Sequence, residues 1–190
     1  MKPDYEIIAF GDATAWRNWL IENHSAVNGL WLRIYKKTSG IASVTYAEAL
    51  DHALCFGWID GQKKSYDELS FLQKFTPRRS KSLWSKRNIE LVSSLTEQGL
   101  MMPAGTAEFD QAKKDGRLDA AYDKPSDMVV PQVFLEELQK HPKAEAFFAT
   151  LNKANTYAIA WRLQTAKSDE TRKRRQEKII AMLDAGEMLH

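Results

Sequence analysis

The chain has 190 residues, of which 44% are hydrophobic, enough for a real core and too many for a disordered protein. Its 27 basic and 25 acidic residues nearly cancel, which argues against a dedicated nucleic-acid binder of high overall charge, although charge can still gather locally. A single cysteine, Cys55, excludes an internal disulfide and is typical of a reducing compartment, and the four dispersed histidines predict no structural metal site.

The sequence predicts no export or membrane-spanning segment. The N-terminal stretch M-K-P-D-Y-E-I-I-A-F has too short an apolar run for a signal peptide. No window approaches the roughly 18 consecutive apolar residues of a spanning helix. We therefore expect a cytoplasmic protein with no transmembrane segment, and the sequence leaves its oligomeric state open.

The first part of the chain alternates between strand and helix patterns. Residues 5–10 predict a short strand, and Asp12 is positioned to cap a helix that runs to about Asn23. Residues 30–37 alternate as a half-buried strand does. Its two predicted sides carry Leu30, Leu32 and Ile34 on one and Trp31, Arg33 and Tyr35 on the other.

A helix and a hairpin follow. Thr45 and Glu48 form a capping-box pattern that begins a helix, and Gly57 is a suitable residue to end it. Residues 58–66 and 70–76 then predict two antiparallel strands. Pro77 ends the second of them.

Charge of one sign is concentrated directly after this hairpin. Between Leu69 and Ile89 every charged residue is basic: Lys74, Arg78, Arg79, Lys81, Lys86 and Arg87. The residues after this stretch have helical spacing, and Ser82 or Ser80 is the expected cap. A helix N-terminus carries partial positive charge and normally attracts acids, so a basic start predicts that an anion lies there.

Beyond residue 99 every predicted element is a helix. One helix is expected between Met102 and Gly116, and Pro131 and Pro142 stand where a first helical turn tolerates proline. Two more helices are predicted over 155–167 and from Ser168 to Gly186. The polar connection at 123–130 favours a boundary between an α+β domain over residues 1–123 and a helical domain over 124–190.

The predicted fold class is therefore α+β, with an N-terminal antiparallel sheet carrying helices on one face and an all-helical C-terminal segment. The irregular order of strands and helices in the first domain favours this arrangement over a doubly wound parallel sheet.

Four blocks together resemble the YdeI/OmpD-associated family of bacteria: A-L-C-F-G-W-I-D-G at 53–61, F-T-P-R-R-S-K-S-L-W-S-K-R-N at 75–88, G-L-M-M-P-A-G at 99–105 and A-K-S-D-E-T-R-K-R-R at 166–175. The resemblance implies that the C-terminal helical segment is a bacteriocin-protection or OmpD-associated domain. That label suggests stress resistance towards antimicrobial peptides, and it names no reaction.

The first candidate site is an anion pocket in the basic stretch. Its predicted ligands are Arg78, Arg79, Ser82 and Arg87, and its predicted walls are Trp58, Trp84 and Asp60. The guanidinium groups of arginines and backbone amides donate hydrogen bonds to an anion, and an indole ring offers a flat surface on which an organic ligand can pack. The alternative is an internal ion pair between Asp60 and Arg78, with Trp84 packed in the core.

The second candidate is an enzyme of unknown reaction that uses Asp60 or Cys55. His52 lies one turn before Cys55 and could activate a thiol, whereas a buried and inert cysteine is the alternative. No nucleophile elbow, phosphate loop or dinucleotide fingerprint is present. No catalytic set is predicted, and no cofactor is expected.

The third candidate is a nucleic-acid surface made from the basic stretch and from the basic start of the last helix, Arg172 to Lys178. The helix start could equally face an acidic lipid or protein, or be a solvated helix end balanced by Asp169, Glu170 and Glu177. Our leading hypothesis is a non-enzymatic protein that binds an anionic small molecule or an acidic partner.

Overall fold

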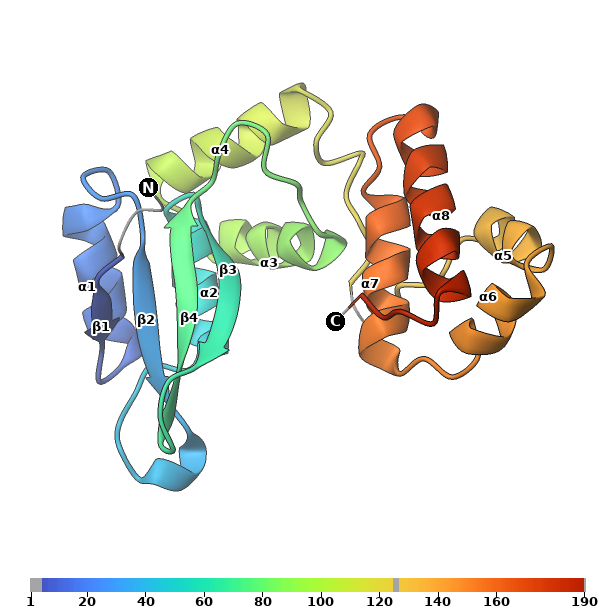
Figure 1. Cartoon of the computed structure of the whole chain (residues 1–190). Helices are drawn as coiled ribbons and strands as arrows, with labels where there is room; N and C mark the ends of the chain where they lie inside the picture. The colour runs from blue at the N-terminus through green and yellow to red at the C-terminus, as the bar shows by residue number, and fades with distance from the viewer. Residues whose placement is uncertain (1–4, 125–126, 190) are drawn as a thin grey trace. The chain divides into compact units, whose positions relative to one another are not determined.

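The computed structural model describes residues 5–124 and 127–189. The chain divides into two compact units between Ala121 and Tyr122 (Figure 1). Unit 1 is a mixed α+β domain, and the described part of unit 2 is helical. We describe each unit by itself.

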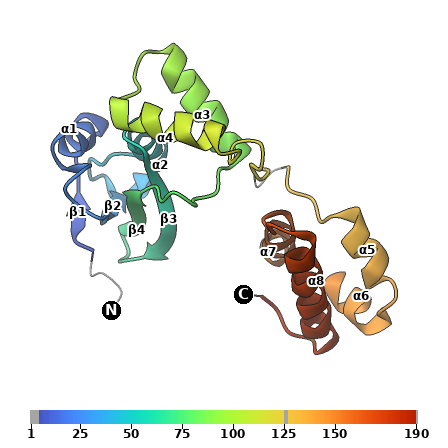
Figure 2. The ribbon, with the colours of Figure 1, turned by 90° about the horizontal axis from the view of Figure 1, so that it is seen from above.

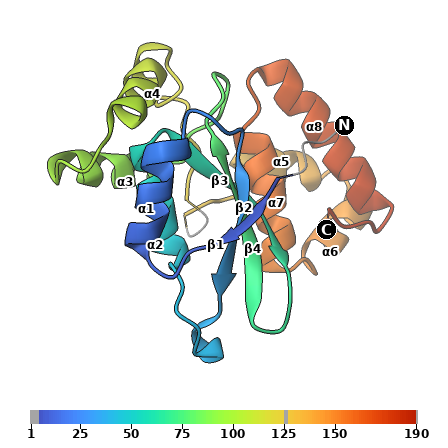
Figure 3. The same ribbon diagram turned by 90° about the vertical axis from the view of Figure 1, so that its left-hand side faces the viewer.

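The sheet of unit 1 has the strand order β1-β2-β4-β3 (Figure 1), and Figure 3 views the same sheet from its β1 side. Its strands are β1 (Ile7–Ala9), β2 (Leu30–Tyr35), β3 (Trp58–Ser65) and β4 (Ser70–Pro77). β2 pairs antiparallel with β4, and β4 with β3. The register of the β3–β4 pair shifts between Asp60 and Lys63.

The prediction of a wholly antiparallel sheet is wrong at one pair, because β1 and β2 run parallel. Between them lies α1 (Ala13–Asn23), which returns the chain to the end of the sheet where β1 began. Such a crossover makes the two strands point the same way. The sheet is therefore mixed.

One face of the sheet forms the core of unit 1 with α1 and α2 (Tyr46–Cys55), which Figure 2 shows on the same side of the sheet. The alternation predicted for β2 is confirmed, since its residues are buried and half-buried in turn. The core includes Trp16, Leu20, Leu30, Leu32, Ile34, Leu50, Leu54, Trp58 and Phe75.

The other face carries polar and aromatic side chains, and we call it the outer sheet face. The strand register assigns to it Ile7 of β1, Trp31, Arg33 and Tyr35 of β2, Lys64 of β3, and Ser70, Leu72 and Lys74 of β4. Trp31, Arg33, Tyr35 and Lys74 are half-buried and Lys64 is exposed.

Two helices complete unit 1: α3 (Lys86–Glu97) and α4 (Pro103–Lys114). The start of α4 lies against the end of α2, where the backbone amide of Met102 donates to the carbonyl of Cys55 at 3.0 Å. A Cβ atom built at Gly105 would lie 2.1 Å from that carbonyl oxygen. The glycine therefore permits the close approach of the two backbones.

Capping residues read from the sequence define the starts of two helices. Asp12 caps α1, and Thr45 and Glu48 form the capping box of α2, both as predicted. Ser168, where the last helix was expected to begin, is its cap. The predicted cap of α3 is wrong, because the cap is Ser85, whose hydroxyl accepts from the amide of Asn88 at 3.1 Å. Residues 80–83 form no helical turn of α3.

Unit 2 consists of α5 (Gln132–Leu138), α6 (Pro142–Phe148), α7 (Lys153–Gln164) and α8 (Asp169–Asp184). Apolar side chains from all four helices form a second core. It includes Phe134, Leu138, Ala144, Ile159, Leu163, Ile179, Ile180 and Leu183. Within the ranges that the structure describes, none of the helices has the length and apolar character that crossing a bilayer requires.

Candidate functional site

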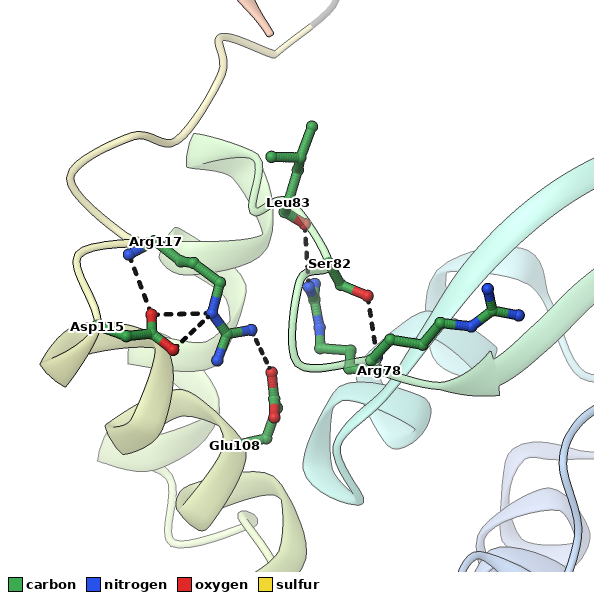
Figure 4. Close-up of polar contacts among 7 residues, drawn as sticks. Arg78, Ser82, Leu83, Glu108, Asp115 and Arg117 are labelled. Atoms are coloured by element: carbon green, nitrogen blue, oxygen red, sulfur yellow. Dashed lines mark hydrogen bonds and ion pairs between the residues drawn. The ribbon is translucent and has the colours of Figure 1, made fainter. Parts of the chain in front are cut away.

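Arg78 is packed into unit 1 at the end of β4. Its guanidinium carbon lies 3.5 Å from the ring centroid of Trp84, and its Nη1 donates to the carbonyl of Leu83 at 3.1 Å (Figure 4). Its backbone amide also donates to the carbonyl of Gly57. With only 9% of its surface exposed, Arg78 closes the loop from 78 to 85 around Trp84.

Ser82 stabilises a tight turn in this loop. Its hydroxyl accepts from the amide of Arg79 at 2.9 Å, and its own amide donates to the carbonyl of Arg79 at 2.8 Å. The free amides at the start of α3 follow Ser85 instead. Ser82 therefore does not contribute through the helix N-terminus that the sequence analysis assigned to it.

The two tryptophans proposed as pocket walls are buried. Trp58 is 1% exposed, and its indole Nε1 donates to the carbonyl of His24 at 3.0 Å. Trp84 is 2% exposed and meets the ring of Phe109 at 72°. Neither indole presents a face to solvent in this structure.

Asp60 and Arg87 each interact with a residue of α2. A carboxylate oxygen of Asp60 accepts from the hydroxyl of Tyr46 at 2.8 Å. Burial raises the pKa of the Asp51 carboxyl on α2. Arg87, which is exposed in the first turn of α3, is close enough for its charge to oppose that rise.

The structure thus brings together Arg78 with Trp84 and Arg79 with Ser82, while Trp58 lies in the core and Asp60 bonds to Tyr46. An anion bound by Arg78, Arg79, Ser82 and Arg87 stays a prediction.

A second cluster of charged side chains, centred on Arg117 and not predicted from the sequence, lies at the end of α4. Arg117 donates through Nη1 to Glu108 at 2.7 Å and through Nε to Asp115 at 2.9 Å (Figure 4). The hydrogen bond from Arg117 lowers the pKa of the Asp115 carboxyl. The sequence D-G-R at residues 115–117 could have predicted this cluster. Its ion pairs hold the segment after α4 against that helix.

Cys55 is fully buried, and burial raises the pKa of its thiol although a hydrogen bond from Arg17 acts in the opposite direction. His52 has its Nδ1 3.4 Å from Nη1 of Arg17, and its pKa is lowered first by burial and then by that charge. This environment favours the neutral thiol over the thiolate nucleophile. Within residues 5–124 and 127–189, no three His, Cys, Asp or Glu side chains are grouped as a metal site would require.

Unit 2 contains a groove of about 740 Å³ between α8 and the segment from α5 to the start of α6, and we call it the α8 groove. Apolar side chains in it come from both sides, and charged side chains accompany them. It is lined by Val133, Glu137, His141, Asp169, Arg172, Lys173, Gln176, Glu177, Ile180, Ala181 and Asp184.

The basic run at the start of α8 does not act as one patch. Arg172 pairs with Asp169 and lines the groove. Arg175 instead donates to the carbonyl of Arg162 and to the hydroxyl of Thr165 on the side of α7. Successive helical residues are about 100° apart, so consecutive cations are distributed around the helix.

Two family models match the chain. Residues 8–108 match the model described as a domain of unknown function, DUF8412, and residues 127–186 match the model described as "Bacteriocin-protection, YdeI or OmpD-Associated". No curated protein and no solved structure matches. The second match confirms the resemblance seen in the sequence over the C-terminal part alone. The chain therefore belongs to the DUF8412 family, and its residues 127–186 match the YdeI/OmpD-associated, bacteriocin-protection family.

Proposed function

We propose that the C-terminal domain binds an amphipathic, positively charged segment of another polypeptide in the α8 groove. The observation that carries this proposal is an apolar strip within reach of solvent and flanked by carboxylates. Val133 is 71% exposed and Ala181 is exposed on the same groove, whereas Ile180 lines the groove from the core with 5% of its surface exposed. Exposed apolar side chains that gather along one groove, unlike those scattered singly over a surface, mark a binding surface.

The groove follows α8 over most of its length. The α8 residues that line it recur every three or four positions from Asp169 to Asp184, which is the spacing of one helix face. A helix of this length extends about 24 Å at 1.5 Å per residue. Such a groove suits a short helical segment, whose apolar side chains also recur every three or four residues.

The charges around the strip favour a cationic occupant. Four carboxylates line the groove, those of Glu137, Asp169, Glu177 and Asp184, against the two cations Arg172 and Lys173. The pKa of Glu137 is lowered, chiefly by the hydrogen bond from Lys140, so this carboxylate stays ionised at neutral pH. Complementary charge mainly raises the association rate and selects the partner.

The description of the C-terminal family supports the same class of partner. It names protection against bacteriocins and association with OmpD, and both imply contact with another polypeptide. No reaction is named. A protein-binding groove is consistent with that description.

A pair of model peptides tests the proposal. The full chain is titrated into a dye-labelled helical peptide of leucine and lysine, with one apolar face, and binding is followed by fluorescence anisotropy. We expect a micromolar dissociation constant that Ala181→Arg raises about tenfold or more, because the new side chain fills the strip and repels the lysines.

The matched control is Ala146→Arg, which adds the same side chain at an exposed helical alanine of α6 that does not line the groove. This variant should bind as the parent does. Equal affinity for a peptide of leucine and glutamate, or an equal loss in both variants, would contradict the proposal.

A further inference from the structure

The outer sheet face of unit 1 pairs cations with aromatic rings. The ammonium of Lys64 lies 4.2 Å from the ring centroid of Trp31, and that of Lys74 lies 4.1 Å from the ring of Tyr5. The guanidinium of Arg33 lies 4.5 Å from the ring of Tyr35 and 5.1 Å from that of Tyr66. One face of one sheet therefore carries several rings and three cations.

The strand register arranges these side chains in rows across the sheet. Trp31 is opposite Lys74, and Arg33, Leu72 and Lys64 form the next row. Leu72 is fully buried although it does not belong to the apolar core cluster of unit 1, so the long side chains beside it lie over it.

The three cations on this face differ in their contacts within the part of the chain that the structure describes. Arg33 forms an ion pair with Asp67 at 2.7 Å. For Lys64 and Lys74, no carboxylate partner is found within the described residues of unit 1. Both ammonium groups are therefore positioned to bind an external anion without first breaking a salt bridge.

We propose that the outer sheet face binds a single-stranded nucleic acid. Bases stack on Trp31 and Tyr35, whose Cα atoms are four residues and therefore about 13 Å apart along β2. Lys64 and Lys74 turn away from the rings and bind phosphates. A stacked base replaces Lys64 at Trp31 and Arg33 at Tyr35, and the surface contact that the cation gives up is the weaker of the two.

The chemistry of the face favours a single strand over a duplex. Ring stacking needs unpaired bases with an accessible face, and these occur in single strands, loops and ends. Because stacking is tolerant of base identity, we expect little sequence preference. Duplex DNA offers only phosphates to this face, and an acidic protein offers no planar groups of this density.

The experiment uses the full chain and a fluorescein-labelled 12-nucleotide oligouridine, with binding followed by anisotropy at several salt concentrations. Lys64→Ala and Lys63→Ala form a matched pair. Each removes an adjacent exposed lysine whose ammonium lies 4.2 Å from an aromatic ring, Trp31 for Lys64 and Phe71 for Lys63. Lys63 pairs in register with Gln73, so it lies on the opposite side of the sheet from Lys64.

We expect Lys64→Ala to weaken binding several-fold and to reduce the slope of log affinity against log salt by about 0.7, the value for one phosphate contact on a single strand. Lys63→Ala should leave both unchanged. Trp31→Ala should weaken binding with no change in slope, and circular dichroism checks that this variant is folded. Lys74→Ala tests the second phosphate-binding lysine in a protein that keeps Trp31.

Three results would overturn the proposal: no binding at low salt, equal affinity for a duplex or for polyglutamate, or the same loss in Lys63→Ala as in Lys64→Ala. No binding at low salt would show that the face is not a binding site. Equal affinity for a duplex or for polyglutamate would show that base stacking plays no part. The same loss in both lysine variants would show that the effect depends only on net charge.

Discussion

The arginines of the 78–87 stretch show how far neighbours in sequence can differ in environment. Arg78 is stacked on Trp84 inside unit 1, Arg79 is exposed beside the turn that Ser82 closes, and Arg87 is exposed near Asp51 of α2. A run of like charge predicts a strong local potential, but the direction of each side chain depends on the backbone. The sequence therefore identified the loop correctly as unusual without placing its side chains.

His52 gives a prediction at the same scale. Burial, and then the charge of Arg17, lowers the pKa of its imidazole below the ordinary value of about 6.5. The unfolded chain then binds more protons than the folded one as the pH falls through about 6.5, so stability present above that pH is lost below it.

We expect the free energy of unfolding, measured by urea denaturation, to fall between about pH 7.5 and about pH 5.5. His52→Gln should show a smaller fall, because the titrating group is gone. Identical pH dependence in the two proteins would contradict a lowered pKa at this residue.

At the scale of elements, the contact between α2 and α4 explains two of the sequence blocks. Gly57, which has a φ of 74°, ends the α2 segment, and Gly105 lies where α4 touches the carbonyl of Cys55. The blocks at 53–61 and 99–105 are thus the two sides of one backbone contact. Gly57 and Gly105 are accounted for by backbone conformation and packing, with no ligand required.

Gly105→Ala tests this explanation. Its Cβ would meet backbone oxygens of Cys55 and Leu54 at 2.1 and 2.7 Å, and backbone cannot turn aside as a flexible side chain can. We expect the free energy of unfolding to decrease by about 1–3 kcal/mol, in the range of overpacked cores. Gly11→Ala is the control, since no atom lies within 4 Å of the added Cβ, and it should change stability little. Equal stability of the two variants would refute the close contact.

The same scale shows what sequence patterns can predict. Alternation identified β2 and its two sides, and short polar motifs identified the caps of α1 and α2 and the start of α8, because these signals are local. The parallel pairing of β1 depends on which strand lies beside it, and the α8 groove depends on helices joined by loops. Such non-local arrangements leave no periodic trace in the sequence, so neither was predicted.

At the scale of the whole molecule, the two units have separate apolar cores. Each core draws its side chains from one unit, so either unit can lose its packing without exposing the core of the other. We therefore expect the units to respond separately to a mutation that affects one core.

Gly105→Ala also tests whether the two units unfold separately. Thermal unfolding followed by circular dichroism should resolve a transition that moves to lower temperature in this variant and a second one that does not move. A fragment of residues 122–190 should keep its helical signal and melt at the temperature of the unshifted transition. A single transition that moves as a whole, or an unfolded fragment, would show that the units are not independent.

The order β1-β2-β4-β3 also decides which backbone groups are left without a neighbouring strand. They belong to β1, which is only three residues long, and to β3, where the register shift between Asp60 and Lys63 is followed by a second lysine. Short, irregular or lysine-bearing edge strands are poor templates for strand addition. Both edges of this sheet therefore oppose aggregation by edge-to-edge pairing between copies of the chain.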